Sequence, residues 1–308
     1  MYIDNFRKLT KKFKKNNNNN RNDIININSI NNVYSSKNNN KLNKLTKKLV
    51  ETCNKVLVSH EDKCQCYDNN NYPSRNHQVC SKNKNNKQCK NYNKCKSTFS
   101  KFMSGYEPYY DPDEWANPLI EGTHNCYMYF LNDQQARLKD KCLDICKNKG
   151  HNNKTCKSKK INSCSNLKPQ PGNHAYRQGI IPKRKRKYTC KEMIYKVLKD
   201  NYDTKNKRYN IKPVKFNQKC PTNTYKGAMV IDTNNTYHFY RQDDNVRYSH
   251  KQGTLRVENK DASGKPIYAP HLADRDYNKK KKKDGITYDK FCSYFCIPNN
   301  NYRDTNAY

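Results

Sequence analysis

The sequence predicts an α+β fold in which a helix carrying Cys126 packs on an antiparallel β-meander. Three observations support this prediction. The composition changes near Met103, after which most of the prolines and apolar runs occur. Apolar spacing typical of helices follows at about 125–147 and 189–201, and short strand-like segments follow from residue 225 onward. This part of the chain can therefore bury a core between helices and a sheet.

Three segments are predicted along the 308-residue chain. Residues 1–50 form a disordered Asn/Lys-rich basic tail, because their apolar side chains are too few for a core. Residues 51–104 form a Cys-rich loop segment held by disulfides, with a disordered linker as the alternative. Residues 105–308 form the α+β domain, with polar inserts at 148–166 and 276–285. The cysteines of the second segment are Cys53, Cys64, Cys66, Cys80, Cys89 and Cys95.

Two helices are expected in the α+β domain before its strands. The first runs from about Asn125 to Lys147, and its apolar positions are Tyr129, Phe130, Leu138, Leu143 and Ile145. The second begins with the capping box Thr189-Cys-Lys-Glu192 and ends near Asn201. Shorter helical patches are expected around Phe6–Lys14 and Leu42–Val50.

The C-terminal third is predicted to be the antiparallel β-meander. Tyr225–Asp232 is an apolar run typical of a buried strand, and Tyr237–Gln242 alternates like a strand after a turn. Val246–His250 is the third strand of the meander. Phe291–Ile297 is a last apolar element near the end of the chain.

The chain is strongly basic, with 62 Lys and Arg against 27 Asp and Glu and a net charge of +35. We therefore expect association with polyanions such as DNA or acidic virion components. The leading nucleic-acid-binding candidates are Lys183, Arg184, Lys185, Arg186 and Lys187, and Lys279–Lys283 is a second basic run. Three alternatives stay open: A/T-rich codon usage, a solvated surface, and a nuclear localisation signal at 183–187.

Fifteen cysteines are many for a reducing cytosol. No Cys-x-x-Cys pair occurs, so we expect no zinc finger and no other metal or cofactor. Disulfides made by an oxidase in the cytoplasmic compartment of a large DNA virus fit better. The N-terminus has no signal-peptide pattern and no stretch is apolar enough for a membrane span, so we expect a virion or host-cytoplasm location. The disulfide candidates are Cys142, Cys146, Cys156, Cys164, Cys292 and Cys296.

Cys126 differs from the other cysteines in its local sequence. It follows the small and polar residues Gly122–Asn125 and precedes an apolar run. This pattern places it in the first turn of a helix, where free N–H groups stabilise a thiolate. We therefore expect Cys126 to be reduced, partly exposed and nucleophilic. The alternative is a packed or disulfide-bonded cysteine.

A cysteine at a helix start, followed by a β-meander with a histidine, is the order found in papain-like cysteine hydrolases, including peptidoglycan hydrolases. His238 is the first candidate for the base and His250 is the rival. Both are structural histidines in the alternative interpretation. Candidates for orienting the imidazole are Asp243, Asp232 and Asn245, and candidates for an oxyanion hole are Asn125 and His124.

Several segments resemble an uncharacterised family of bacterial and viral proteins. They are Thr236–Gly253, Asn259–Ile267, Ala273–Arg275 and Tyr288–Pro298, with Asn125–Tyr127 and Pro169–Gly172 upstream. The resemblance covers about residues 105–300 and implies a shared domain and a shared site, without an established reaction. This chain departs from the family in Tyr248, where Trp is usual, in Gln252, where Pro is usual, and in the lysine insert. The Asn/Lys-rich style and the basic tail resemble proteins of mimivirus-like giant viruses.

Two functions therefore compete. The first is a cysteine hydrolase that cleaves an amide bond in peptide or cell-wall material, with Cys126 as nucleophile and His238 as base. The second is a non-catalytic, disulfide-stabilised virion structural protein or a basic protein associated with nucleic acid. Tyrosines interleaved with lysines suit stacking on single strands. The two are compatible, since basic tails could carry an enzyme-derived domain in a particle.

Overall fold

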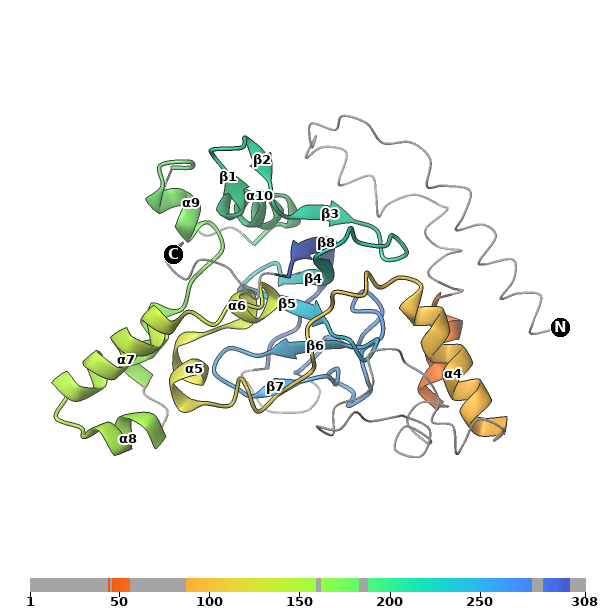
Figure 1. The fold of residues 1–308 in the computed structure, drawn as a ribbon, viewed down its shortest axis with the longest axis horizontal. Coiled ribbons are helices and arrows are strands. Elements are labelled where there is room, and N and C mark those ends of the chain that lie inside the picture. Colours follow the sequence, from red (N-terminus) through yellow and green to blue (C-terminus); the bar gives the residue numbers. More distant parts are fainter. Residues whose placement is uncertain are drawn as a thin grey trace.

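The computed structural model of the chain (Figure 1) describes residues 44, 46–55, 87–158, 162–182, 188–278 and 285–299. Residues 1–43 of the predicted basic tail lie outside the described residues. The clusters Lys183–Lys187 and Lys279–Lys283 also lie outside them, as do Cys64, Cys66 and Cys80.

The centre of the described fold is a six-stranded antiparallel sheet in the order β3-β8-β4-β5-β6-β7. The predicted meander is present as β4 to β7, and the last apolar element returns as β8 between β3 and β4. Together with the helices this makes the fold α+β, as predicted. The strands are β3 Lys212–Val214, β4 Thr224–Asp232, β5 Thr236–Gln242, β6 Tyr248–Lys251, β7 Val257–Glu258 and β8 Lys290–Pro298.

Helices lie around this sheet, and a small two-stranded sheet follows helix α10 in the chain (Figure 1). The helices are α4 Lys87–Ser100, α5 Pro118–Thr123, α6 Cys126–Phe130, α7 Ala136–Asn148, α8 Asn153–Ser158, the 3-10 helix η2 Asn162–Leu167, α9 Asn173–Arg177 and α10 Cys190–Asp200. The small sheet pairs β1 Tyr202–Asp203 with β2 Arg208–Tyr209.

The central strands are buried on both faces, because successive side chains point to opposite sides of a sheet. One face, the α6 face, packs against α6 and α10 through residues such as Met229, Phe239 and Phe295. The other face, the α4 face, packs against α4 through residues such as Val230, Tyr240 and Tyr294. Burial on both faces explains why every residue of β4 after Thr224 is buried, Lys226 included, rather than every second one.

The expected helix 125–147 is two helices rather than one. α6 ends at Phe130, and Asn132 adopts a left-handed conformation with φ of 50°. The chain restarts as α7 after Gln135, whose N–H donates to Nε2 of His124. Asn is one of the few residues that adopts this conformation at low cost, so the break is local and specific.

The second expected helix is confirmed as α10. The Oγ1 of Thr189 accepts a hydrogen bond from the N–H of Glu192 at 3.3 Å, as an N-cap should. Its apolar residues at helical spacing are all buried against the α6 face of the sheet: Met193, Ile194, Val197 and Leu198.

The described part of the Cys-rich segment is helical rather than loop-like. Residues 46–55 are helical and α4 covers 87–100. The disulfide Cys53–Cys95 joins the two, and Tyr92 and Phe99 of α4 are buried with the sheet. Helix α4 was not predicted from the sequence, because polar residues separate its buried positions. Those buried positions are largely cysteine and aromatic residues.

The six predicted disulfide candidates all form disulfides. Cys142–Cys164 and Cys146–Cys156 lock the polar insert onto α7. Cys190–Cys292 joins α10 to β8, and Cys220–Cys296 joins the loop before β4 to the same strand. The insert is therefore a covalently tied helical unit, and β8 is anchored twice.

Removal of the Cys190–Cys292 disulfide should destabilise the protein more than removal of Cys146–Cys156. The two bonds close sequence separations of 102 and 10 residues, and the chain-entropy model gives about 4.7 and about 2.7 kcal/mol. Urea unfolding of Cys190→Ala/Cys292→Ala and Cys146→Ala/Cys156→Ala variants measures the difference. Equal losses, or a larger loss for the short loop, would contradict this ranking.

Candidate functional site

Cys126 is the first residue of α6, as the sequence predicts. Asn125 is the N-cap, and its Oδ1 accepts hydrogen bonds from the N–H groups of Tyr127 at 3.1 Å and Met128 at 3.2 Å. The short polar side chain before Cys126 thus starts the helix at this position. Among the cysteines in the described ranges, Cys126 is the one with a free thiol.

The thiol is buried, contrary to the expectation of a partly exposed thiolate. Cys126 is 5% exposed, and burial raises the pKa of its thiol to about 12. The N–H of Phe239 and the charge of Lys251 act in the opposite direction, followed by the N–H groups of Tyr127 and Cys126 itself. Desolvation outweighs these donors, so the resting thiol is neutral. The Phe239 N–H belongs to β5, so the thiol lies beside this strand.

His238 and His250 are partners rather than rivals. Nε2 of His238 and Nδ1 of His250 are 2.9 Å apart, and Nε2 of His250 is 3.0 Å from the carbonyl oxygen of Lys260. A carbonyl can only accept, so Nε2 of His250 carries the proton and its Nδ1 accepts from Nε2–H of His238. Because the neutral His238 carries its proton on Nε2, this series of hydrogen bonds leaves Nδ1 of His238 unprotonated.

Both imidazoles are neutral at neutral pH. Burial lowers the pKa of His250 to about 4, and burial followed by the charge of His250 lowers the pKa of His238 well below its usual value. Neutrality is required by the hydrogen-bond chain, because a protonated His250 could not accept from His238.

Tyr288 is an aromatic neighbour of the histidine pair. Its ring stacks on His238 with centroids 5.1 Å apart and an interplanar angle of 21°. Burial, and next the charge of a Cys126 thiolate, raise the pKa of Tyr288. Tyr288 is therefore stacked on His238 and lies within electrostatic range of Cys126.

Within the described residues, none of the predicted orienting residues forms a hydrogen bond with the imidazole of His238 or His250. Asp243 bonds Nε of Arg241 at 2.8 Å and the hydroxyl of Ser249. Asp232 accepts from the N–H groups of the turn that follows it, and Asn245 accepts from the N–H of Arg247. These side chains form turns and a buried ion pair, and His250 takes the orienting position.

Asn125 and His124 also bond to other parts of the protein. Nδ2 of Asn125 donates to the carbonyl of Pro169 at 2.7 Å, so its amide N–H and its oxygen both have protein partners. His124 accepts from the N–H of Gln135 and shares a 2.8 Å contact with Oγ1 of Thr123.

Sequence reasoning missed Lys251. The side chain is fully buried, and Nζ donates to the carbonyl of Gly253 at 2.7 Å. Lys251 lies on the same side of β6 as Ser249, which bonds the hydroxyl of Tyr129 on α6. The charge of Lys251 lowers the pKa of both Cys126 and His124. A lysine after a strand histidine carries no sequence signal of its burial.

Asp200 is a second residue that the sequence pattern did not single out. Its carboxyl group accepts from the N–H of Gly172 at 2.6 Å, the N–H of Ala175 at 2.9 Å and the hydroxyl of Tyr127 at 3.1 Å. Together with the Asn125–Pro169 bond, these contacts fix the loop 169–172 beside the start of α6.

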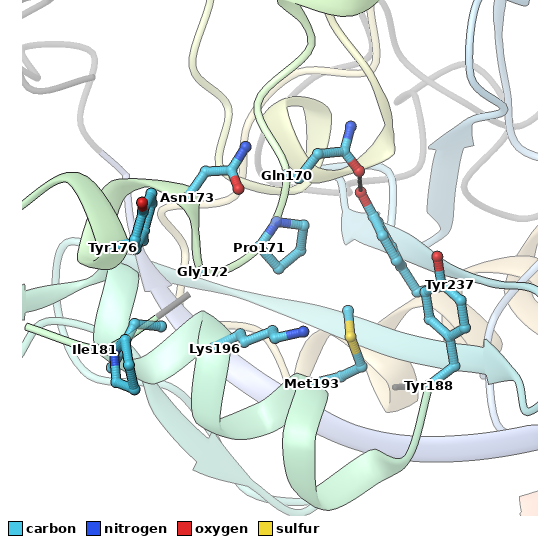
Figure 2. Close-up of a pocket in the computed structure, with 11 residues that line it drawn as sticks. Gln170, Pro171, Gly172, Asn173, Tyr176, Ile181, Tyr188, Met193, Lys196 and Tyr237 are labelled. Atoms are coloured by element: carbon cyan, nitrogen blue, oxygen red, sulfur yellow. Dashed lines mark hydrogen bonds between the residues drawn. The ribbon is translucent and has the colours of Figure 1, made fainter. Parts of the chain in front are cut away.

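A pocket of about 270 Å³ lies between this loop and α10 (Figure 2). Tyr237, which precedes His238 on β5, forms one wall, and its hydroxyl donates to Oε1 of Gln170 at 2.5 Å. Tyr188, Met193 and Tyr237 belong to or pack against the same apolar cluster as Cys126. The lining residues are Gln170, Pro171, Gly172, Asn173, Tyr176, Ile181, Pro182, Tyr188, Met193, Lys196 and Tyr237.

Within the described ranges, no three His, Cys, Asp or Glu side chains gather in a way that could hold a metal ion. The described helices are too short or too polar for a membrane span. The predicted nucleic-acid-binding cluster Lys183–Lys187 lies outside the described residues.

No family model matches the chain, and no solved structure matches it. A 48-residue stretch is 48% identical to insoluble matrix shell protein 1 of Ruditapes philippinarum. The stretch is 16% of this chain and 32% of that protein, so the chain spans about a third of its length. This local similarity does not assign the chain to a family.

The protein should lose stability in acid through its buried neutral histidines. Burial lowers the pKa of His124 to about 3, so the unfolded state binds more protons between pH 6.5 and about 3. The free energy of unfolding therefore falls by about 1.4 kcal/mol per pH unit for each such histidine as the pH drops below 6.5. Asp200, whose pKa burial raises to about 6, acts in the opposite direction.

Urea unfolding at pH 7.5 and pH 5.0 tests this for His124. In His124→Gln the difference between the two pH values should be about 2 kcal/mol smaller than in the unaltered protein, because glutamine does not titrate. His124 is suited to this comparison because glutamine can still accept from the N–H of Gln135. An identical pH dependence in both proteins would contradict the assignment of His124 as a buried neutral group.

Proposed function

We propose that this chain is a papain-like cysteine hydrolase that cleaves an amide bond in peptide or cell-wall material. The observation that carries the proposal is the hydrogen-bond chain from His238 to His250 to the Lys260 carbonyl. It leaves Nδ1 of His238 as a free base on the strand whose next residue, Phe239, contacts the Cys126 thiol. Nucleophile, base and orienting group are thus supplied in the roles that thiol catalysis needs.

The reaction begins with Sγ of Cys126 attacking the carbonyl carbon of the scissile amide. The S–C bond forms as the thiol proton moves to Nδ1 of His238. The same proton then passes to the leaving nitrogen as the C–N bond breaks, which releases the amine and leaves a thioester. Water attacks the thioester carbon, His238 takes a proton from it and returns a proton to sulfur, and the acid is released.

Burial of Cys126 and His238 determines the stage of the reaction at which the thiol proton is transferred. Burial raises the pKa of the thiol and lowers that of His238, so a resting thiolate–imidazolium pair is unfavourable. Transfer therefore accompanies attack on the substrate. The imidazolium that forms donates Nε2–H to His250, and the Phe239 N–H and the charge of Lys251 favour negative charge on sulfur.

Amide hydrolysis by the purified, oxidised chain tests the proposal, with peptidoglycan and an unfolded protein as substrates. Cys126→Ala and His238→Ala should each lower the rate by at least about a hundredfold, because each removes a group that takes part in the reaction. His271→Asn is the matched control, since His271 is a histidine bonded to Tyr294 on the α4 face. Activity that survives in Cys126→Ala would contradict the proposal.

A second candidate is a non-catalytic, disulfide-stabilised basic structural protein. The local similarity to an insoluble shell matrix protein and the five described disulfides favour it, and both suit an oxidising location, either extracellular or in a virion. The net charge of +35 adds an attraction to polyanions, DNA or acidic particle components among them.

DNA binding at increasing salt tests this second candidate. If lysine and arginine contact phosphates, the affinity should fall roughly tenfold or more between low and physiological salt, because binding releases counterions. Electrophoretic mobility or fluorescence anisotropy with a random single-stranded DNA measures it. An affinity that does not change with salt would exclude phosphate contacts as the basis of the function.

A further inference from the structure

We propose that the pocket between the 169–172 loop and α10 binds a peptide segment that carries a carboxylate, with Lys196 as the residue that recognises the charge. This inference rests on the proposed hydrolase function, because it takes the bound peptide to be part of the substrate. The contacts that support binding are independent of catalysis.

Lys196 is held in the pocket by its neighbours. Its stem runs under Gly172, where an added Cβ would stand 2.9 Å from Cγ of Lys196, and Gly172 has a φ of 91° that favours glycine. The glycine of the Pro-Gln-Pro-Gly segment thus allows the lysine to lie flat against the loop. Figure 2 shows this side chain crossing the pocket floor between Gly172 and Met193.

The ammonium group of Lys196 keeps donors for a ligand. Its ion pair with Glu192 spans 3.7 Å on adjacent turns of α10, and an ammonium has three N–H donors. Of the described residues that line the pocket, Lys196 is the one with a formal charge at neutral pH, and none of them is acidic. An anionic group is therefore favoured over a cationic one.

Two further polar groups line the same pocket. The side-chain amide of Asn173 and the hydroxyl of Tyr188 make no hydrogen bond with the described residues, whereas Gln170 is occupied by Tyr237 and by the Lys168 carbonyl. Lys196, Asn173 and Tyr188 together offer donors from different walls of the pocket. A carboxylate, which only accepts, matches this set.

The remaining surface suits the rest of a peptide. The rings of Tyr188 and Tyr237 lie with centroids 6.4 Å apart at 40°, and Met193 and Pro171 complete an apolar lining. A volume of about 270 Å³ is small for a nucleic-acid strand. A short peptide with one carboxylate fits the charge and the size.

The pocket is joined to the proposed nucleophile at two points. Tyr237 forms its wall and directly precedes His238 on β5. The loop beside it is tied to the α6 N-cap by the bond from Asn125 to Pro169. A carboxylate bound by Lys196 would therefore lie on the part of the substrate that leads to the scissile amide.

Binding of two neutral-ended peptides to the full-length Cys126→Ala protein tests the inference. The probes are acetyl-Ala-Glu-Ala-amide and acetyl-Ala-Gln-Ala-amide, which differ by one charge, and calorimetry measures their affinities. The Glu peptide should bind at least about fivefold more tightly, and Lys196→Met should remove this preference. Lys199→Met is the matched control, because Lys199 lies on the same helix but faces Tyr195, Tyr202 and Tyr209.

Equal affinity for the two peptides, or an equal effect of Lys199→Met, would overturn the inference. Absence of measurable binding at millimolar peptide would overturn it as well. Selective binding of the Glu peptide together with no hydrolysis by the unaltered protein would support the pocket and contradict the proposed hydrolase, so the two failures can be told apart.

Discussion

The close packing of α6 on the sheet is the constraint on which the rest of the site depends. Phe130 lies against Gly227 of β4, where a Cβ would stand 2.5 Å from its ring, and the hydroxyl of Tyr225 donates to the Phe130 carbonyl at 2.7 Å. Only glycine permits this approach. Because α6 is five residues long, fixing Phe130 also fixes Cys126 against the Phe239 N–H, one residue from His238.

Burial gives the site its electrostatic character. Cys126, His238 and His250 are all removed from water, so each is held in its neutral form. In this neutral site, the hydrogen bonds from His238 to His250 and from His250 to the Lys260 carbonyl leave Nδ1 of His238 unprotonated. In the proposed reaction, Lys251 and the backbone N–H groups would favour charge on sulfur as it develops, rather than in the resting state.

Much of this fold could be predicted from the sequence, because its signals are local. β4 contains the apolar run Ala228–Ile231, α10 has a capping box, and Asn125 precedes a helix start. The rest depends on three-dimensional packing. The packing of helix α4 on the sheet and the burial of the thiol follow from contacts between distant segments. For the same reason His250 was expected to be a rival of His238, whereas the paired strands bring it to Nε2 of His238.

The most direct test of the account is the rate at which iodoacetamide alkylates Cys126 in the oxidised protein, followed by mass spectrometry across pH 6 to 9. If His238 takes the thiol proton, Cys126 should react at neutral pH, and His238→Phe should slow it by at least about tenfold. His271→Asn should leave the rate unchanged. A rate that is the same in the unaltered protein and in His238→Phe would contradict the central claim that Nδ1 of His238 serves the Cys126 thiol.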